Sequence, residues 1–233
     1  MSFIRIGGIE KFSIVDFPNQ MAAVVFMQGC PWRCPYCHNA HLQDVNAETN
    51  IVWEKFIDFL KQRKGILDAV VFSGGEPLVQ KGLKEAIMEV RDMGYKIGLH
   101  TGGYRPQYFM EILPFTDWVG FDIKAPLRED RYKEITGGKA EIEKVKESLR
   151  ILCESGKHFE CRTTCDPRFL KTEDIYEIAD SLKAMGVREY YLQKYRPVPS
   201  DTDTTEGQCA MLVEDEKLNA YLKGCFEVFD VRK

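Results

Sequence analysis

No long hydrophobic run occurs in this sequence. Charged residues interrupt every apolar stretch well before the roughly 20 residues that a membrane-spanning helix requires. They also interrupt the first sixteen positions, where a secretory signal peptide would need an apolar core. The pattern predicts a protein of the cytoplasm that does not bind a membrane.

An excess of basic charge is also missing. Lysine and arginine number 32 against 36 aspartates and glutamates, which gives a net charge of -4. A nucleic-acid-binding protein usually carries a basic surface, so this class is not expected. With 233 residues, 44% of them hydrophobic, the chain fits a single α/β domain over 1–233. We expect its core at about 20–196 and a C-terminal extension at about 197–233.

What the sequence does contain is eight cysteines. Without a secretory signal, they are expected to be reduced thiols or metal ligands rather than disulfides. Cys30, Cys34 and Cys37 lie within one short loop after the apolar stretch 21–27. Three thiolates at this spacing can hold three irons of a [4Fe-4S] cluster, and the fourth iron then has no protein thiolate. An open coordination position is typical of a metal centre that performs chemistry.

Two other interpretations of the cysteine loop remain open. A zinc ion would need a fourth ligand nearby, and His38 or His41 is close enough in the sequence to provide it. A disulfide framework fits less well, because disulfide scaffolds are small secreted domains and this chain is long and rich in expected helices.

Apolar strand-like runs alternate with helical patterns along most of the chain. Such alternation predicts parallel strands joined by right-handed crossovers. Six strand–helix units are too few for an eight-stranded barrel, so we expect a partial, open (β/α)6 barrel. Residues 4–16, which can form a hairpin, and 201–233 are expected outside the repeat, and the composition of 197–207 predicts a mobile segment. The expected strands are 22–28, 69–73, 96–101, 118–124, 158–164 and 189–195, and the expected helices are 53–63, 81–93, 107–113, 140–154 and 172–184.

Polar residues gather where the expected strands end. Barrel enzymes place their chemistry at the carboxyl ends of the strands. Charged side chains inside apolar strands are costly unless they are paired or used. The agreement among six strand ends therefore favours a functional site. The residues concerned are Gly74, Gly75, Glu76, His100, Thr101, Asp122, Lys124, Arg162 and Gln193, besides the three loop cysteines.

Each of these residues has a purely structural alternative when it is taken singly. The glycine pair before Glu76 can form a tight strand-to-helix turn that leaves the carboxylate in solvent. Asp122 can form an internal ion pair with the lysine two positions later, on the same face of the strand. Arg162 can pair with Glu160.

Three motifs, taken together and in this order, resemble a known family. They are Gly-Cys-Pro-Trp-Arg-Cys-Pro-Tyr-Cys-His-Asn at 29–39, Gly-Gly-Glu-Pro at 74–77 and Asp-Ile-Lys at 122–124. The cysteine spacing resembles the radical S-adenosylmethionine (SAM) superfamily, and the set resembles its glycyl-radical-enzyme activating family. The likeness is greatest to the longer type of anaerobic ribonucleoside-triphosphate reductase activating protein, and pyruvate formate-lyase activating enzyme is the next relative. It rests on the runs 8–18, 122–126, 162–164 and 192–197.

The resemblance implies a [4Fe-4S] cluster and SAM as cofactors. It makes Cys30, Cys34 and Cys37 the cluster ligands, with the amine and carboxylate of SAM completing the fourth iron. The SAM-binding residues that it implies are Tyr36, Gly74, Gly75, Glu76, Thr101, Asp122, Lys124 and Arg162.

Individual roles follow from the same resemblance. Glu76, with the two glycines before it, receives the methionine amine of SAM. Lys124 and Arg162 neutralise the SAM carboxylate or fix the ribose, and Asp122 contributes a hydrogen bond. Tyr36 lines the adenine pocket, although a packed loop aromatic is the structural alternative.

One departure from the family concerns residues 100–103. Related activases usually have Asp-Thr-Asn-Gly here, whereas this chain has His-Thr-Gly-Gly. Without the Asp, Thr101 remains as the hydrogen-bonding group, and His100 is either a SAM contact or a structural histidine. Cysteines outside the loop are expected to be mostly buried hydrophobes, with one candidate reactive thiol at Cys209. These cysteines are Cys153, Cys161, Cys165, Cys209 and Cys225.

The resemblance finally implies an activity. A flavodoxin or ferredoxin reduces the cluster, and SAM is cleaved to methionine and a 5′-deoxyadenosyl radical. This radical takes a hydrogen atom from a glycine of a partner enzyme. The partner that the resemblance favours is anaerobic ribonucleotide reductase. The alternatives are activation of a pyruvate formate-lyase-like partner and a small-molecule radical SAM enzyme of the deazapurine synthase type. A non-catalytic iron–sulfur or zinc protein would leave the second and third motifs without a role.

Overall fold

The computed structural model describes residues 4–198 and 201–233. Its core is one sheet of eight strands, which are neighbours in the same order as they occur along the chain. The strands are β1 Ile6–Ser13, β2 Ala22–Met27, β3 Ala69–Gly74, β4 Lys96–Thr101, β5 Trp118–Asp122, β6 His158–Cys165, β7 Glu189–Lys194 and β8 Val228–Arg232.

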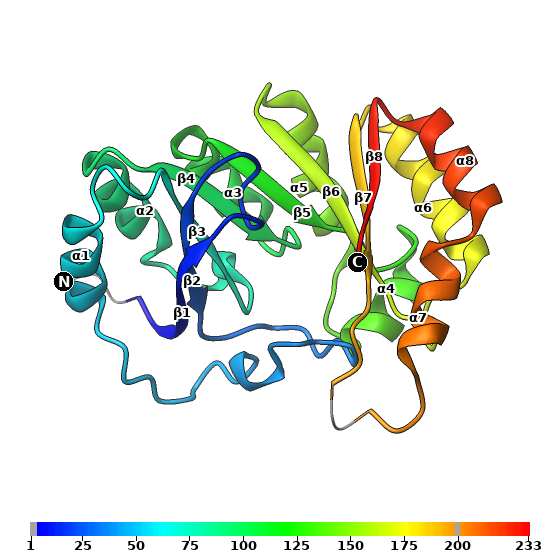
Figure 1. Cartoon of the computed structure of the whole chain (residues 1–233), viewed down its shortest axis with the longest axis horizontal. Helices are drawn as coiled ribbons and strands as arrows, with labels where there is room; N and C mark the ends of the chain where they lie inside the picture. The colour runs from blue at the N-terminus through cyan, green and yellow to red at the C-terminus, as the bar shows by residue number, and fades with distance from the viewer. Residues whose placement is uncertain (1–3, 199–200) are drawn as a thin grey trace.

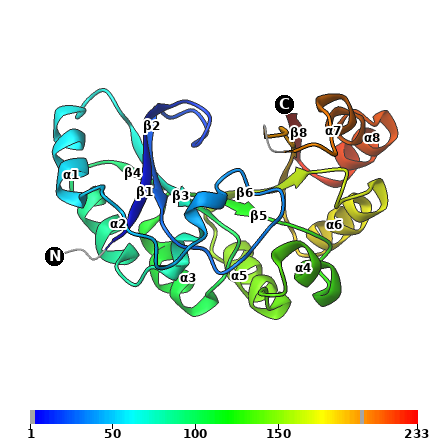
Figure 2. The same ribbon diagram turned by 90° about the horizontal axis from the view of Figure 1, so that it is seen from below.

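The sheet is parallel except at its first pair, where β1 runs antiparallel to β2. Parallel neighbours need long crossover connections, and helices supply them. Figure 1 shows α1 and α2 beside one half of the sheet and α6 and α8 beside the other, and Figure 2 shows the helices along the outer side of its curve. The helices are α1 Trp53–Gln62, α2 Leu83–Asp92, α3 Pro106–Ile112, α4 Glu129–Thr136, α5 Ile142–Glu154, α6 Thr172–Ala184, α7 Glu206–Val213 and α8 Glu216–Cys225, with short 3-10 helices at η1 Ala40–Leu42, η2 Pro77–Val79 and η3 Leu113–Phe115.

In β2, β3 and β5, alternate residues belong to two separate apolar layers, because successive side chains in a strand point to opposite faces. The larger layer lies between the sheet and the helices. The smaller layer lies on the inner face and includes Ala22, Val24, Ala69, Val71 and Trp118. Phe17, from the loop between β1 and β2, stacks on the Trp118 ring at 5.3 Å between centroids. This loop therefore fills part of the inner face of the curved sheet.

The predicted partial α/β barrel is confirmed. The six expected strands are β2 to β7, with ends that differ by at most two residues from the prediction. Both extensions, however, add a strand to the sheet: β1 pairs with β2, and the segment 201–233 forms α7, α8 and β8. Helix α4 was not predicted, because it is short and buries few apolar side chains.

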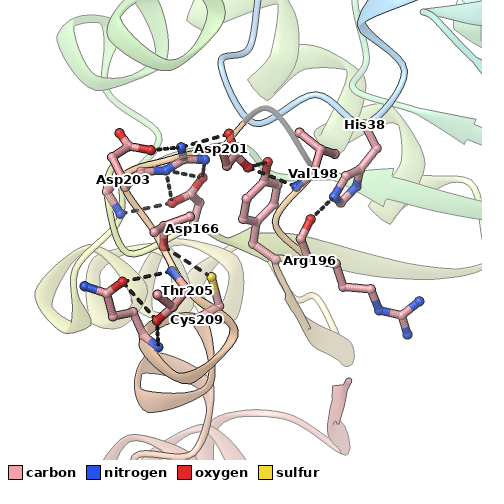
Figure 3. Close-up of polar contacts among 12 residues, drawn as sticks. His38, Asp166, Arg196, Val198, Asp201, Asp203, Thr205 and Cys209 are labelled. Atoms are coloured by element: carbon pink, nitrogen blue, oxygen red, sulfur yellow. Dashed lines mark hydrogen bonds and ion pairs between the residues drawn. The ribbon is translucent and has the colours of Figure 1, made fainter.

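Part of the segment 197–207, which was predicted to be mobile, lies outside the described residues, namely positions 199 and 200. Its described part is held in place by ion pairs. Arg168 lies 3.1 Å from an Asp201 oxygen and 2.7 Å from an Asp203 oxygen (Figure 3). Among the described helices, none is long and apolar enough to cross a membrane.

Candidate active site

A cavity of about 170 Å³ opens among the loops that follow the parallel strands. Its walls come from the loop after β2 and from the carboxyl ends of β3, β4, β5 and β6. The cavity thus lies where a barrel enzyme places its chemistry. Of the residues that the sequence singles out in the cysteine loop, at the strand ends or as expected SAM contacts, all line the cavity except Arg162 and Gln193. Those that line it are Cys30, Cys34, Tyr36, Cys37, Gly74, Gly75, Glu76, His100, Thr101, Asp122 and Lys124.

The cysteine loop packs directly on the turn after β3. The Glu76 N–H donates to the Gly29 carbonyl at 2.9 Å, and a Cβ on Gly75 would lie 2.2 Å from the same oxygen. Gly74 has a φ of +104°, and its Cβ would lie 2.3 Å from the Met27 nitrogen. Only glycine fits at either position. The tight turn considered above is therefore real, but it directs Glu76 into the cavity rather than into solvent.

Helix α4 supports the other side of the cysteine loop. The Arg33 N–H donates to the Thr136 carbonyl at 2.9 Å. Gly137 ends the helix with a φ of +68°, and a Cβ there would lie 2.8 Å from the Cβ of Arg33. The Tyr132 hydroxyl accepts a hydrogen bond from the Lys124 N–H at 3.1 Å. The acidic first turn and the glycine after the helix were the signals that could have predicted this element.

The loop thiols fit iron–sulfur chemistry better than a single metal ion. Burial, and then the charge of Glu76, raises the pKa of Cys30 to about 12, and burial also raises the pKa of Cys34. Metal binding therefore releases protons here, since the ligand is the thiolate. In residues 4–198 and 201–233, no three His, Cys, Asp or Glu side chains converge on one ion position. A zinc ion would need its ligands at about 2.0–2.3 Å from one point, whereas each cysteine of a [4Fe-4S] cluster binds a different iron.

His38, one of the two candidate fourth zinc ligands, has another role. The Nε2 of His38 lies 2.8 Å from the Arg196 carbonyl, and its ring stacks on Tyr195 at 5.0 Å (Figure 3). The imidazole is thus bound to the segment after β7, which does not favour the zinc interpretation.

Glu76 is buried and accepts three hydrogen bonds, which leaves room for one more on Oε2. Its Oε1 accepts from the Leu78 N–H at 3.1 Å and the Thr101 hydroxyl at 2.6 Å, and its Oε2 accepts from the Gly102 N–H at 2.9 Å. Burial raises the pKa of Glu76, although these three donors lower it in part. A carboxylate fixed in this way, without a full counter-charge, is suited to a positively charged ligand group.

Asp122 and two cations form a second charged group beside the cavity. The Nε and Nη2 of Arg162 donate to Oδ1 of Asp122 at 2.9 and 2.7 Å, and the Nζ of Lys124 lies 3.6 Å from Oδ2. Burial alone would raise the pKa of Asp122, but the positive charges of Arg162 and Lys124 outweigh it and lower the pKa. Burial would lower the pKa of Lys124, but Asp122 and the cysteines raise it well above its usual value. Two cations around one carboxylate leave a net positive charge, which suits an anionic ligand group.

The structural alternative in which Arg162 pairs with Glu160 is wrong, because Arg162 pairs with Asp122. Glu160 is fully buried and accepts from both terminal nitrogens of Arg232, including Nη2 at 2.7 Å. The Arg232 guanidinium also lies 3.9 Å from the centre of the Tyr191 ring. This ion pair joins β8 to the inner face of β6. Sequence reasoning missed it because the two residues are 72 positions apart.

His100 uses both ring nitrogens within the protein. Its Nε2 donates to the Asp16 carbonyl at 2.9 Å, and its Nδ1 accepts from the Ser73 hydroxyl at 3.1 Å. Burial, and then the charge of Arg162, lowers the pKa of His100 to about 3. The imidazole is therefore neutral and ties the β1–β2 loop to β3 and β4, which favours the structural interpretation.

The five cysteines outside the loop do not line the cavity. All eight cysteines of the chain are free. Cys161, Cys165 and Cys209 are completely buried, and Cys153 and Cys225 are partly buried. Burial raises the pKa of Cys161 well above its usual value. Cys209 is not accessible as a reactive thiol.

A second hollow of about 670 Å³ adjoins the cavity, and we call it the groove. His38 and Thr164 line both spaces. One wall of the groove is the β1–β2 loop, where Ile14 and Val15 are 66% and 77% exposed. The other wall comes from β6, β7 and the C-terminal end of the chain. It includes Arg162, the one residue expected to bind SAM that does not line the cavity.

Comparison with known proteins agrees with this geometry. The family model described as the Radical SAM superfamily matches residues 24–165. A protein of Methanocaldococcus jannaschii, described as a glycyl-radical enzyme activating enzyme, is 32% identical over 246 residues, which cover 96% of this chain and 98% of that protein. A pyruvate formate-lyase-activating enzyme of Clostridium pasteurianum is 37% identical over 138 residues, or 57% of each chain. The SAM-bound crystal structure of SuiB from Streptococcus suis superimposes with a TM-score of 0.66 at 16% identity, over 88% of this chain and 48% of that one.

The family model agrees with the partial barrel and the cysteine loop on the superfamily, and the relative from Methanocaldococcus jannaschii indicates the family within it. The chain belongs to the radical SAM superfamily and, within it, to the glycyl-radical enzyme activating family. Enzymes of this superfamily use a [4Fe-4S] cluster and SAM, and these are the cofactors of this enzyme.

Proposed function

We propose that this enzyme cleaves SAM reductively and generates a glycyl radical on a partner protein, with Cys30, Cys34 and Cys37 as ligands of the [4Fe-4S] cluster. The observation that carries the proposal is that the three cysteines line the same cavity as Glu76 and Lys124. When it is bound, the cluster supplies a low-potential electron and an open iron for the amino-acid end of SAM.

The cavity offers a partner to each of the two groups at the methionine end of SAM, an amine and a carboxylate. The amine that binds the open iron would be neutral. Glu76, fixed by three donors, would accept a hydrogen bond from an N–H of this amine. Lys124, which stays protonated, receives the carboxylate, and Arg162 supports it by neutralising Asp122. The protein thereby binds and orients SAM, and no side chain has to act as a general base.

Two of the expected contacts act through other residues. Thr101 donates its hydroxyl hydrogen to Glu76, so its role is to orient that carboxylate. Tyr36 is 6% exposed, and its hydroxyl donates to the Lys124 carbonyl at 3.3 Å. It therefore forms a wall of the cavity, whether or not the adenine ring reaches it.

The groove is where a partner protein would approach. It joins the cavity at His38 and Thr164, so a glycine in an extended loop could reach the bound SAM from this side. An external donor such as flavodoxin or ferredoxin supplies the electron. Eight free cysteines fit the reducing environment of the cytoplasm.

Anaerobic ribonucleotide reductase is the first partner to test, because the runs 8–18 and 192–197 resemble its activating protein. A pyruvate formate-lyase-like enzyme is the alternative, since relatives of this chain carry that name. The test is an anaerobic EPR measurement with reconstituted enzyme, dithionite, SAM and each candidate partner in turn. A glycyl-radical doublet on one partner, absent with the Cys34→Ala variant, identifies that partner and supports the proposal.

A small-molecule radical SAM enzyme would behave differently in the same experiment. It would release 5′-deoxyadenosine without a doublet on any glycyl-radical partner. An intact, reducible cluster that neither cleaves SAM nor produces a doublet would refute both catalytic proposals.

A further inference from the structure

Tyr195 touches both neighbours of the third loop cysteine. It follows β7 directly and is 1% exposed. Its ring stacks on His38 at 5.0 Å between centroids and 9° between planes. The same ring meets the edge of Tyr36 at 6.5 Å and 68°. Tyr36 and His38 flank Cys37, so the residues on both sides of that cysteine contact the same ring, that of Tyr195.

We propose that Tyr195 is a positioning residue that holds Cys37 in place for iron binding. The other two cysteines have backbone anchors outside the loop. The Cys30 N–H donates to the Gln43 carbonyl at 3.2 Å, and Arg33, next to Cys34, donates to Thr136 of α4 at 2.9 Å.

Cys37 is held differently. Its N–H donates to the Cys34 carbonyl at 3.2 Å, which is a contact within the loop itself. Its connection to the rest of the protein therefore runs through its two neighbours. Of these, His38 also donates from its Nε2 to the Arg196 carbonyl at 2.8 Å (Figure 3). Both contacts of His38 end on the segment that begins at Tyr195.

Tyr195 is fixed well enough to serve as an anchor. Its hydroxyl donates to Asp201 at 2.6 Å, and its N–H donates to the Cys165 carbonyl at 3.3 Å. The Arg168 guanidinium lies over its ring at 5.3 Å. Arg168 is held in turn by Asp166, which is completely buried, and by Asp201 (Figure 3). The ring is thus constrained at its edge, at its face and through its backbone.

The consequence concerns the cluster rather than the partner protein. A [4Fe-4S] cluster requires its three sulfurs at a fixed mutual spacing. If the Tyr195 ring is removed, the backbone around Cys37 loses the one support that its two neighbours share, while Cys30 and Cys34 keep theirs. Iron should then be held less tightly, and the environment of the cluster should change.

The experiment uses the reconstituted holoenzyme and two readouts besides activity: the rate of iron release to a chelator, and the EPR spectrum of the reduced cluster with SAM. Tyr195→Leu removes the ring, and Tyr195→Phe keeps it. His38→Ala and His38→Phe repeat this comparison at an exposed position where folding is not at risk. Tyr190→Leu is the matched control, because Tyr190 is an equally buried tyrosine of β7 that bonds Thr163 and packs on Phe226 instead.

We expect Tyr195→Leu to release iron about tenfold faster than the wild type and to alter the EPR spectrum, given the worth of two aromatic contacts. His38→Ala should show a smaller effect of the same kind. Tyr195→Phe should lie close to the wild type, and His38→Phe, which keeps the stacking but loses the bond to the Arg196 carbonyl, should lie between the wild type and His38→Ala. Equal iron release from Tyr190→Leu and Tyr195→Leu would reduce the effect to general destabilisation and overturn the proposal. Unchanged iron release and spectra in Tyr195→Leu and His38→Ala would overturn it as well.

Discussion

Replacing Glu76 with Gln tests the assignment of the SAM amine most sharply. The substitution keeps the shape of the side chain and removes its negative charge. Glu76 lies in the turn after β3 and accepts hydrogen bonds from Leu78, Thr101 and Gly102. If the carboxylate accepts a hydrogen bond from the amine of SAM, the variant should still fold, with some loss of stability, and should bind SAM poorly.

The magnitude follows from the contacts of the two oxygens. A hydrogen bond to a charged group contributes about 1.5–3 kcal/mol, so losing the charge should raise the Kd for SAM about 10- to 150-fold. The amide NH2 must also face one of the present donors, such as the Gly102 N–H. An unsatisfied buried donor costs about 1–3 kcal/mol, which should appear as a lower free energy of unfolding.

Anaerobic calorimetry with the reconstituted enzyme measures the SAM affinity, and urea unfolding measures the stability. Glu89→Gln is the matched control, because Glu89 is a glutamate of α2 that accepts a hydrogen bond from Trp53 at 2.7 Å outside the cavity. pH adds a second signature. Because the pKa of Glu76 is raised, the wild type should lose SAM affinity as the pH falls towards that pKa, and Glu76→Gln should not.

Either of two results would refute the role of Glu76 in SAM binding. If Glu76→Gln loses stability but binds SAM as tightly as the wild type, then Glu76 only caps the 3-10 helix after β3. If Glu89→Gln weakens SAM binding to the same extent, the effect does not come from the cavity.

Three further substitutions test other parts of the account. Gly75→Ala places a Cβ 2.2 Å from the Gly29 carbonyl, so it should cost about 1–3 kcal/mol in urea unfolding and lower the iron content; an unchanged iron content would contradict the close packing of the two loops. Arg162→Lys loses the paired donors to Asp122. Because a charge-assisted contact is then partly lost, SAM binding measured by calorimetry should weaken about tenfold. An unchanged Kd would show that Arg162 does not contribute to SAM binding. His100 should contribute a loss of about 1.4 kcal/mol of unfolding free energy per pH unit below about 6.5, because the unfolded chain protonates His100 there and the folded chain does not until about pH 3. His100→Gln should therefore lose less stability than the wild type between pH 7 and pH 5, and equal losses would contradict the neutral imidazole.

The sequence predicted the repeating part of the fold because its signals are local. The strands β2, β3 and β5 are mostly apolar runs, and β4, β6 and β7 carry apolar residues among polar ones. Glycines end several of the helices between them. β8 could not be predicted in the same way. The stretch Val228–Arg232 is short and partly charged, and it becomes a strand by pairing with β7. That pairing depends on α7 and α8 returning the chain to the edge of the sheet, which is a tertiary effect.

The candidate site was predictable as a set of residues but not as a set of contacts. Parallel strands bring their carboxyl ends to one edge, so Glu76 and Lys124 had to lie near the cysteine loop. The partner of Arg162 was not predictable, since Glu160 and Asp122 offer the same charge. Arg232, a residue of the last strand, forms an ion pair with Glu160, and Arg162 therefore pairs with Asp122. Tyr195 stood in the sequence as an ordinary strand end, and only the packing shows its contact with His38.

Isotope transfer tests the central claim most directly. The partner glycyl-radical enzyme is prepared with glycine deuterated at the α-carbon, and the reduced activase is allowed to react with SAM in its presence. If this enzyme takes hydrogen from the partner glycine, the 5′-deoxyadenosine that forms should carry one deuterium, and the partner should show a glycyl-radical signal of equal amount. Unlabelled 5′-deoxyadenosine with no radical on either candidate partner would contradict the account.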